Sequence, residues 1–141
     1  MKKKIIIGAA VVVGLIAVIC AINILRGHWL VPSQIQRVEF QGHDSCGGPV
    51  SKTVELSDSE IHSMVAYYNL ASYAGRVDAE SCVSEFSFRI YLKNGTRIYI
   101  REAYAPRIEV NLPQQDKYWI NSIQLSNFAQ TLIEKYDLTV S

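Results

Sequence analysis

This chain of 141 residues has little glycine or proline. It contains only 8 Gly and 4 Pro, has no internal repeat, and is rich in Val, Ile, Leu and Tyr. Collagen-like and low-complexity chains need far more Gly or Pro, and disordered chains have too few apolar residues to form a core. The composition therefore indicates a globular protein.

Positive charge is also scarce over most of the chain. Four of the 14 Lys and Arg residues precede residue 34, which leaves ten basic and 13 acidic residues within 34–141. That segment has a net charge of −3, whereas a nucleic-acid binder needs a dense basic surface. We therefore expect no nucleic-acid partner.

Motifs of the common catalytic classes are missing as well. The chain has no G-x-S-x-G nucleophile elbow, no phosphate-binding loop and no dinucleotide-binding glycine pattern. Two close acidic pairs, Asp58 with Glu60 and Asp78 with Glu80, have a two-residue spacing that points side chains apart on a helix. We therefore predict a protein that is not an enzyme and uses no cofactor.

One long stretch near the N-terminus has no charge at all. Residues 5–25 are apolar, and Asn23 is their only strongly polar side chain. Because a helix rises about 1.5 Å per residue, roughly 20 apolar residues cross the hydrocarbon core of a bilayer, which is about 30 Å thick. We predict a transmembrane helix over 5–25 that contacts the lipid bilayer.

The flanking charges predict how this helix is oriented. Three lysines occupy residues 2–4, whereas Arg26 and His28 are the basic residues that follow the apolar run. Basic residues favour the cytoplasmic side, so residues 1–4 are predicted to be cytoplasmic and the C-terminal domain to lie outside. Trp29 stands where an interfacial aromatic residue would anchor the far end. The predicted location is the cell membrane, with a single-pass signal anchor.

Cleavage of this segment is the alternative. A cleaved signal peptide has a similar basic start, but its apolar region is usually about 7–15 residues long and ends in a small-x-small site. Here Ile19 occupies the outer position of the best such site, Ile19-Cys20-Ala21. A lipoprotein signal centred on Cys20 would need a small residue where Ile19 stands. We therefore prefer a retained anchor.

Beyond the anchor, residues 26–34 are predicted to form a linker, because Pro32 makes a continuous helix improbable. Residues 35–141 then form one extracytoplasmic domain. Ser57 and Glu60 have the spacing of a capping box at the start of its first helix, and Gly75 is a plausible end. The predicted apolar stripe of this helix is Ile61, Met64, Val65, Tyr68 and Ala71.

A second helix has Asn121 as its predicted N-cap, with Gln124 three residues later. Its predicted buried side is Leu125, Phe128, Ala129, Leu132, Ile133 and Tyr136. Strands are predicted between the helices, because apolar and polar residues alternate over 86–92 and again over 97–101. Residues 107–112 are predicted as a third strand, and 35–41 and 52–56 are weaker candidates.

The turn between the first two strands sets their register. A three-residue loop, Lys93-Asn94-Gly95 with Gly95 left-handed, pairs Ile90 with Ile98 and keeps the apolar row on one face. The sequence Asn94-Gly95-Thr96 also matches the N-glycosylation motif, but the turn alone explains these residues.

The predicted fold is α+β. It is a small two-layer sandwich of an antiparallel sheet, with a three-strand meander, one or two N-terminal strands, and two helices on one face.

This register places Arg and Tyr together on the opposite face of the sheet. The predicted binding face comprises Arg89, Tyr91, Arg97, Tyr99 and Arg101. Arg and Tyr are enriched at recognition surfaces, but cross-strand Arg–Tyr pairs can also simply cover an exposed sheet. Both explanations stay open at this point.

Cys46 and Cys82 are the two cysteines of the outer segment, and an oxidising location favours a disulfide between them. A metal site formed by both with His43 and His62 is the alternative, but the spacing contains no second ligand pair. We predict no metal.

The sequence thus indicates a membrane-anchored, non-enzymatic binding or accessory module with an unknown protein or small-molecule ligand. The alternatives are a structural or regulatory subunit of another membrane protein, and a small hydrolase or redox protein.

Overall fold

The structure, a computed structural model, describes residues 1–45, 52–77 and 83–138. Within these ranges the protein has an α+β fold, with three α-helices and an open antiparallel sheet of seven strands. The helices are α1 (Lys2–Leu25), α2 (Asp58–Asn69) and α3 (Ile123–Tyr136), and a short 3-10 helix, η1, covers Pro32–Gln34. The strands are β1 (Ile35–Ser45), β2 (Thr53–Glu55), β3 (Ser72–Arg76), β4 (Val83–Leu92), β5 (Arg97–Tyr104), β6 (Arg107–Asn111) and β7 (Tyr118–Asn121).

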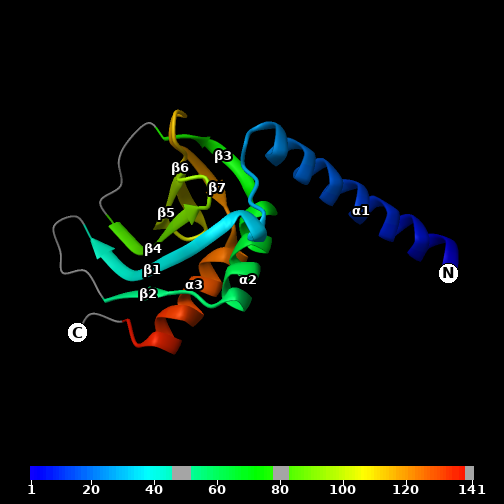
Figure 1. Cartoon of the computed structure of the whole chain (residues 1–141). Coiled ribbons are helices and arrows are strands. Elements are labelled where there is room, and N and C mark those ends of the chain that lie inside the picture. Colours follow the sequence, from blue (N-terminus) through cyan, green and yellow to red (C-terminus); the bar gives the residue numbers. More distant parts are fainter. Residues whose placement is uncertain (46–51, 78–82, 139–141) are drawn as a thin grey trace.

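Helix α1 extends away from the rest of the protein (Figure 1). It is 24 residues long, and it is the one helix in the described ranges that is long and apolar enough to cross a membrane. Its Ile, Val and Leu side chains are largely exposed, which suits contact with lipid. The helix predicted over 5–25 is therefore confirmed.

The sheet has the strand order β2-β1-β4-β5-β6-β7-β3. Ile90 pairs with Ile98 across the β4–β5 hairpin, and Gly95 in its turn has a φ of 90°, a left-handed value that suits glycine. The predicted three-residue loop and its register are thus confirmed. The candidate strands over 35–41, 52–56 and 107–112 also exist, as β1, β2 and β6.

Two strands at one edge of the sheet were not predicted. The segment chosen as the end of the first helix is β3, which pairs with β7. Gly75 was therefore wrongly assigned as a helix end: α2 already ends at Asn69, and Gly75 lies in an irregular part of β3 with a φ of 115°. A left-handed glycine suits a bulge as well as a helix end, and the local sequence does not distinguish them.

The cap of α3 also differs from the prediction by one residue. Asn121 belongs to β7, where it pairs with Ser72, and Ser122 is the N-cap. The Ser122 hydroxyl accepts a hydrogen bond from the Leu125 amide at 3.1 Å. Both Asn and Ser are good caps, so the pairing of Asn121 with another strand decides between them.

A single hydrophobic cluster joins the sheet to α2 and α3. Its largest fully buried side chains are Tyr68, Phe40, Phe86, Phe88, Met64, Ile90, Ile100, Ile108, Ile120, Leu125, Leu132 and Leu138. The apolar stripe predicted for the first helix is buried throughout, but its last residue, Ala71, lies beyond the end of α2. Phe128 and Tyr136 of α3 are only partly buried. Each large apolar side chain removed from water contributes about 1.5–3 kcal/mol, so this cluster dominates the stability of the fold.

Glu60 connects the two helices of the domain. As predicted, it completes a capping box with Ser57, whose amide donates to the Glu60 carboxylate at 2.8 Å. The same carboxylate accepts from Lys135 Nζ at 2.5 Å and from Tyr136 Oη at 3.0 Å. Burial opposes the ionisation of Glu60, but these hydrogen bonds outweigh it and lower the pKa of the carboxyl group. A local cap thus also holds α2 against α3.

Candidate functional site: the outer face of the sheet

The Arg and Tyr residues of the β4–β5 hairpin lie in the predicted register. Arg89 is opposite Tyr99, and Tyr91 is opposite Arg97. These positions alternate with the buried Ile90 and its neighbours, so they occupy the other face of the sheet. We call this surface, formed by Arg89, Tyr91, Arg97, Tyr99 and Arg101, the Arg–Tyr face.

Part of this surface is hollowed. Arg89, Tyr91, Arg97 and Tyr99 line a depression of about 450 Å³, together with Asn111 of β6 and Pro113 beyond it. The volume is in the range of sites that hold small ligands or a few side chains of a partner. The depression therefore brings together four of the five residues that the sequence had singled out.

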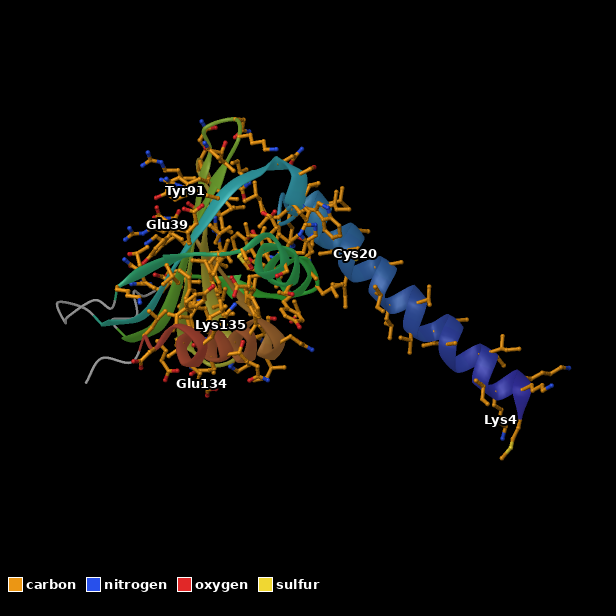
Figure 2. All side chains as sticks on the ribbon, turned by 60° about the horizontal axis from the view of Figure 1, so that its bottom comes forward. Lys4, Cys20, Glu39, Tyr91, Glu134 and Lys135 are labelled. Atoms are coloured by element: carbon orange, nitrogen blue, oxygen red, sulfur yellow. The ribbon has the colours of Figure 1, made fainter. Side chains whose placement is uncertain are left out.

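Tyr91 is held in place by neighbours from β1. Its hydroxyl donates to Glu39 Oε2 at 3.0 Å, and the Arg37 guanidinium lies 4.3 Å from the centre of its ring. Figure 2 shows Tyr91 and Glu39 on the same side of the molecule. Arg37 also pairs with Glu39 at 3.4 Å. These contacts therefore hold the Tyr91 ring in one orientation on the face of the sheet.

Arg101 has a different role from the other arginines. Its guanidinium lies 3.3 Å from Glu109, which is only 2% exposed and is also 3.6 Å from Lys117 Nζ. Arg101 does not line the depression. The structure thus assigns it to an ion-pair cluster that neutralises a buried carboxylate.

Arg89 and Arg97 are exposed, and no carboxylate of the described chain lies within ion-pair distance of either guanidinium. The Arg89 guanidinium lies 6.0 Å from the Tyr99 ring, and that of Arg97 lies 5.5 Å from the Tyr91 ring. A guanidinium offers several donors in one plane, which matches a carboxylate or phosphate. The depression therefore combines two available cations with two aromatic rings.

The predicted disulfide and the alternative metal site fall largely outside the described residues. Cys46 and Cys82 lie outside them, and so does the side chain of His43. His62 is exposed on α2, and its Nδ1 donates to the Asp58 carbonyl oxygen at 2.8 Å. No group of three or more His, Cys, Asp or Glu side chains that could hold a metal occurs in the described part of the chain.

A second polar site, at the end of α1, was missed by the sequence analysis. His28 is 1% exposed, and its ring stacks on Tyr68 with centroids 3.7 Å apart. Its Nε2 lies 2.7 Å from the Tyr68 carbonyl oxygen, and its Nδ1 lies 2.5 Å from Tyr118 Oη. A carbonyl can only accept, so Nε2 carries a proton, and in the neutral ring Nδ1 accepts from the Tyr118 hydroxyl.

The environment of this histidine keeps it neutral. Burial lowers the pKa of His28 to about 4, although its bond with the Tyr68 carbonyl acts in the opposite direction. Burial also raises the pKa of Tyr118 to about 12, so its hydroxyl remains a donor. The network thus has one stable protonation state near neutral pH.

Asn23, the single polar residue of the apolar run, belongs to the same site. It is 3% exposed, and its Nδ2 donates to the carbonyl oxygens of Asn69 at 2.7 Å and Ala71 at 3.0 Å. The Asn69 side chain in turn exchanges two hydrogen bonds of 2.8 Å with the backbone of Leu30. We call the group of Asn23, His28, Tyr68, Asn69 and Tyr118 the junction network.

One signal in the sequence pointed to this network. A strongly polar residue inside a lipid-facing run is costly unless it finds a partner, and Asn23 is such a residue. Its partners are 46 and 48 residues away, so no local spacing could identify them. Comparisons found no protein family that matches the chain, and no curated protein or solved structure that matches it either.

Proposed function

We propose that this protein is a membrane-anchored, extracytoplasmic binding module without enzymatic activity, and that its Arg–Tyr face binds an acidic surface of a partner protein. The observation that carries the proposal is the depression lined by Arg89, Tyr91, Arg97 and Tyr99. In this proposal α2 and α3 cover the other face of the sheet in a two-layer sandwich, and a disulfide joins Cys46 to Cys82.

Charge and residue type favour a protein partner with acidic groups. Arg37 and Arg101 are paired with carboxylates of this chain, whereas Arg89 and Arg97 are available to an external one. Exposed ion pairs contribute little by themselves. Tyr and Arg, however, contribute most of the energy at many interfaces. A tyrosine ring buries a large area with few rotatable bonds, and a guanidinium offers several hydrogen-bond donors in one plane. An acidic segment that lies between the two tyrosine rings would contact the rings and pair with the arginines.

The location in this proposal rests on α1 and its flanking charges. The helix is long and apolar enough to span a bilayer, and the lysines at 2–4 favour a cytoplasmic N-terminus. A reporter enzyme fused after Ser141 should therefore be active outside the cytoplasm and inactive within it. Activity only in the cytoplasm would contradict the proposed orientation.

Capture of partners by the full-length, membrane-anchored chain tests the proposed binding. We expect Arg97→Ala and Tyr99→Ala to abolish capture of the partner that the unmodified chain retains after cross-linking. Lys93→Ala is the matched control, because Lys93 is an exposed cation in the neighbouring turn that does not line the depression. It should leave capture unchanged.

Folding must be measured in the same variants. Both substituted chains should retain the circular dichroism spectrum and melting temperature of the unmodified protein to within a few degrees. Undiminished capture by both folded variants would contradict the proposal and leave the Arg–Tyr face as a covering of the sheet.

A further inference from the structure

The exposed large apolar side chains in the described part of the domain gather at one end. Apart from Met1 and α1, the described chain exposes five of them: Trp29, Val31, Leu70, Tyr73 and Ile123. Trp29 and Val31 flank the buried Leu30, whose backbone is bonded to Asn69 of the junction network. A cluster of this kind on one side of a soluble domain marks a contact surface.

The other three residues lie at the same end of the molecule. Leu70 stands between the two residues whose carbonyl oxygens accept hydrogen bonds from Asn23. The Arg26 guanidinium lies 3.7 Å above the Tyr73 ring. Ile123 opens α3 close to the pairing of Asn121 with Ser72 at the edge of the sheet. All five residues therefore belong to segments that meet where α1 joins the domain.

Cationic groups accompany these apolar residues. Arg26 and Arg76 line a hollow of about 280 Å³ with Tyr73, Gln115, Asp116 and Tyr118. Arg76 pairs with Asp116 at 2.5 Å, whereas the Arg26 guanidinium lies over the Tyr73 ring and its charge also acts on the nearby Tyr118 hydroxyl. Arginine and aromatic residues side by side are typical of the headgroup layer of a membrane.

No flexible segment separates the end of α1 from the part of the domain that carries these apolar residues. Ile19 and Cys20 are already half-buried, and Asn23 is inserted into the domain; Figure 2 shows Cys20 on the part of α1 next to the domain. The apolar residues before Asn23, 5–22, extend about 27 Å as a helix, close to the ~30 Å of a hydrocarbon core. The domain therefore begins where the span ends.

We propose that Trp29, Val31, Leu70, Tyr73 and Ile123, together with Arg26, form a membrane-docking surface that lies in the lipid headgroup layer and holds the domain in one orientation. This inference rests on the proposed function, because it requires α1 to span the bilayer. The junction network keeps the surface and the helix in a fixed relation, since Asn23 and His28 are bonded to α2 and β7 of the domain.

Fluorescence quenching by lipid tests this docking surface. The full chain is reconstituted into phosphatidylcholine vesicles that carry bromine on the upper part of the acyl chain, which quenches tryptophan on contact. Leu70→Trp, in a chain whose Trp29 and Trp119 are replaced by Phe, should be quenched strongly. Leu70 is a better position for the probe than Trp29. Trp29 follows α1 so closely that it would approach lipid even if the domain were attached by a flexible linker.

The control is the chain with Trp29→Phe, in which Trp119 is the sole tryptophan. Trp119 is buried, and the Arg107 guanidinium lies 5.7 Å from the centre of its ring. Lipid should therefore not reach it, and its emission should not change. Asn23→Ala in the Leu70→Trp chain should reduce the quenching, because it removes both bonds that hold α1 to the domain.

The outcomes separate this inference from the proposed function. If alkaline carbonate extracts the chain from the vesicles, α1 does not anchor it and the proposed function is wrong. If the chain stays in the membrane and the tryptophan at position 70 is quenched no more than Trp119, the anchor stands and the docking surface is wrong.

Discussion

The Arg–Tyr face and the junction network are both polar, but they are built in opposite ways. The face comes from one hairpin, with partners such as Arg89 and Tyr99 a few residues from a single turn. The network joins three separate parts of the chain, since Asn23 and His28 bond to α2 and to Tyr118 of β7. The face is open to water, whereas the network is buried.

This difference determines what each region contributes. Exposed charges are screened and well hydrated, so their pairing stabilises a fold only slightly and leaves them available for a partner. Buried polar groups have exchanged water for fixed partners, so the loss of one partner leaves another unsatisfied. We therefore expect substitutions in the junction network to affect stability, and substitutions in the Arg–Tyr face to affect binding.

The largest effect is expected from His28→Ala. The change removes a fully buried ring stacked on Tyr68 and leaves the Tyr118 hydroxyl and the Tyr68 carbonyl without their partner. By analogy with large-to-small core substitutions, the free energy of unfolding should fall by about 3–5 kcal/mol. Denaturant unfolding of the full chain in detergent micelles measures this free energy. A loss below about 1 kcal/mol, the net value of one ordinary hydrogen bond, would show that the network is not tightly packed.

A comparable effect is expected at the other end of β1 and β4. The last described pair of these strands is Ser45 opposite Val83, and Cys46 and Cys82 are the next residues in the sequence on either side. A disulfide between Cys46 and Cys82 would close a loop of 37 residues, for which the chain-entropy estimate is about 4 kcal/mol.

Thiol titration and melting test this disulfide. The unmodified chain should show no reactive thiol from Cys46 or Cys82 until it is reduced, and reduction should lower its melting temperature. A Cys20→Ala chain removes the third cysteine from the assay. Two reactive thiols in that non-reduced chain, or stoichiometric zinc, would favour the metal alternative.

The pH dependence of stability gives another test of the junction network. The pKa of His28 is about 4 in the folded protein and 6.5 is its ordinary value, so below pH 6.5 the unfolded chain takes up a proton that the folded chain does not. The free energy of unfolding should therefore be undiminished above pH 6.5 and fall by about 3 kcal/mol as the pH drops toward 4.

His28→Gln isolates this contribution from that of the carboxyl groups. Glutamine can donate to the Tyr68 carbonyl and accept from Tyr118, but it does not titrate. The difference between the two stability profiles should thus grow between pH 6.5 and pH 4. Parallel profiles over that range would mean that His28 is protonated as readily in the folded protein as in the unfolded one.

The contrast between the two regions also explains what the sequence could predict. The register of the Arg–Tyr face followed from period-two alternation and a turn with Gly95, both local signals. The depression itself needed Asn111 and Pro113, which come from the neighbouring strand and the residues beyond it. Its location was therefore predictable, but its shape was not.

Tertiary pairing decided the features that the sequence analysis missed. β3 has little alternation, and it exists because β7 pairs with it. The same pairing draws Asn121 into the sheet and moves the cap of α3 to Ser122. Residues 26–34, predicted as a linker, carry the buried His28 and Leu30. Each of these features depends on a partner at a distance that no short window of sequence contains.

The smallest effect on stability is expected from Tyr99→Ala in the Arg–Tyr face. Tyr99 is only partly buried and lies opposite Arg89, so its loss should cost no more than an ordinary cross-strand pair, about 0.2–1 kcal/mol. Ile90→Asp, one residue along β4 from Arg89, is the contrasting control: Ile90 is fully buried, and an unpaired charge there should unfold the domain. Denaturant unfolding under the conditions used for His28→Ala makes the three values comparable. If Tyr99→Ala approached His28→Ala in cost, the face would be a structural element like the junction network, and its tyrosines would be needed by the fold whether or not a partner binds.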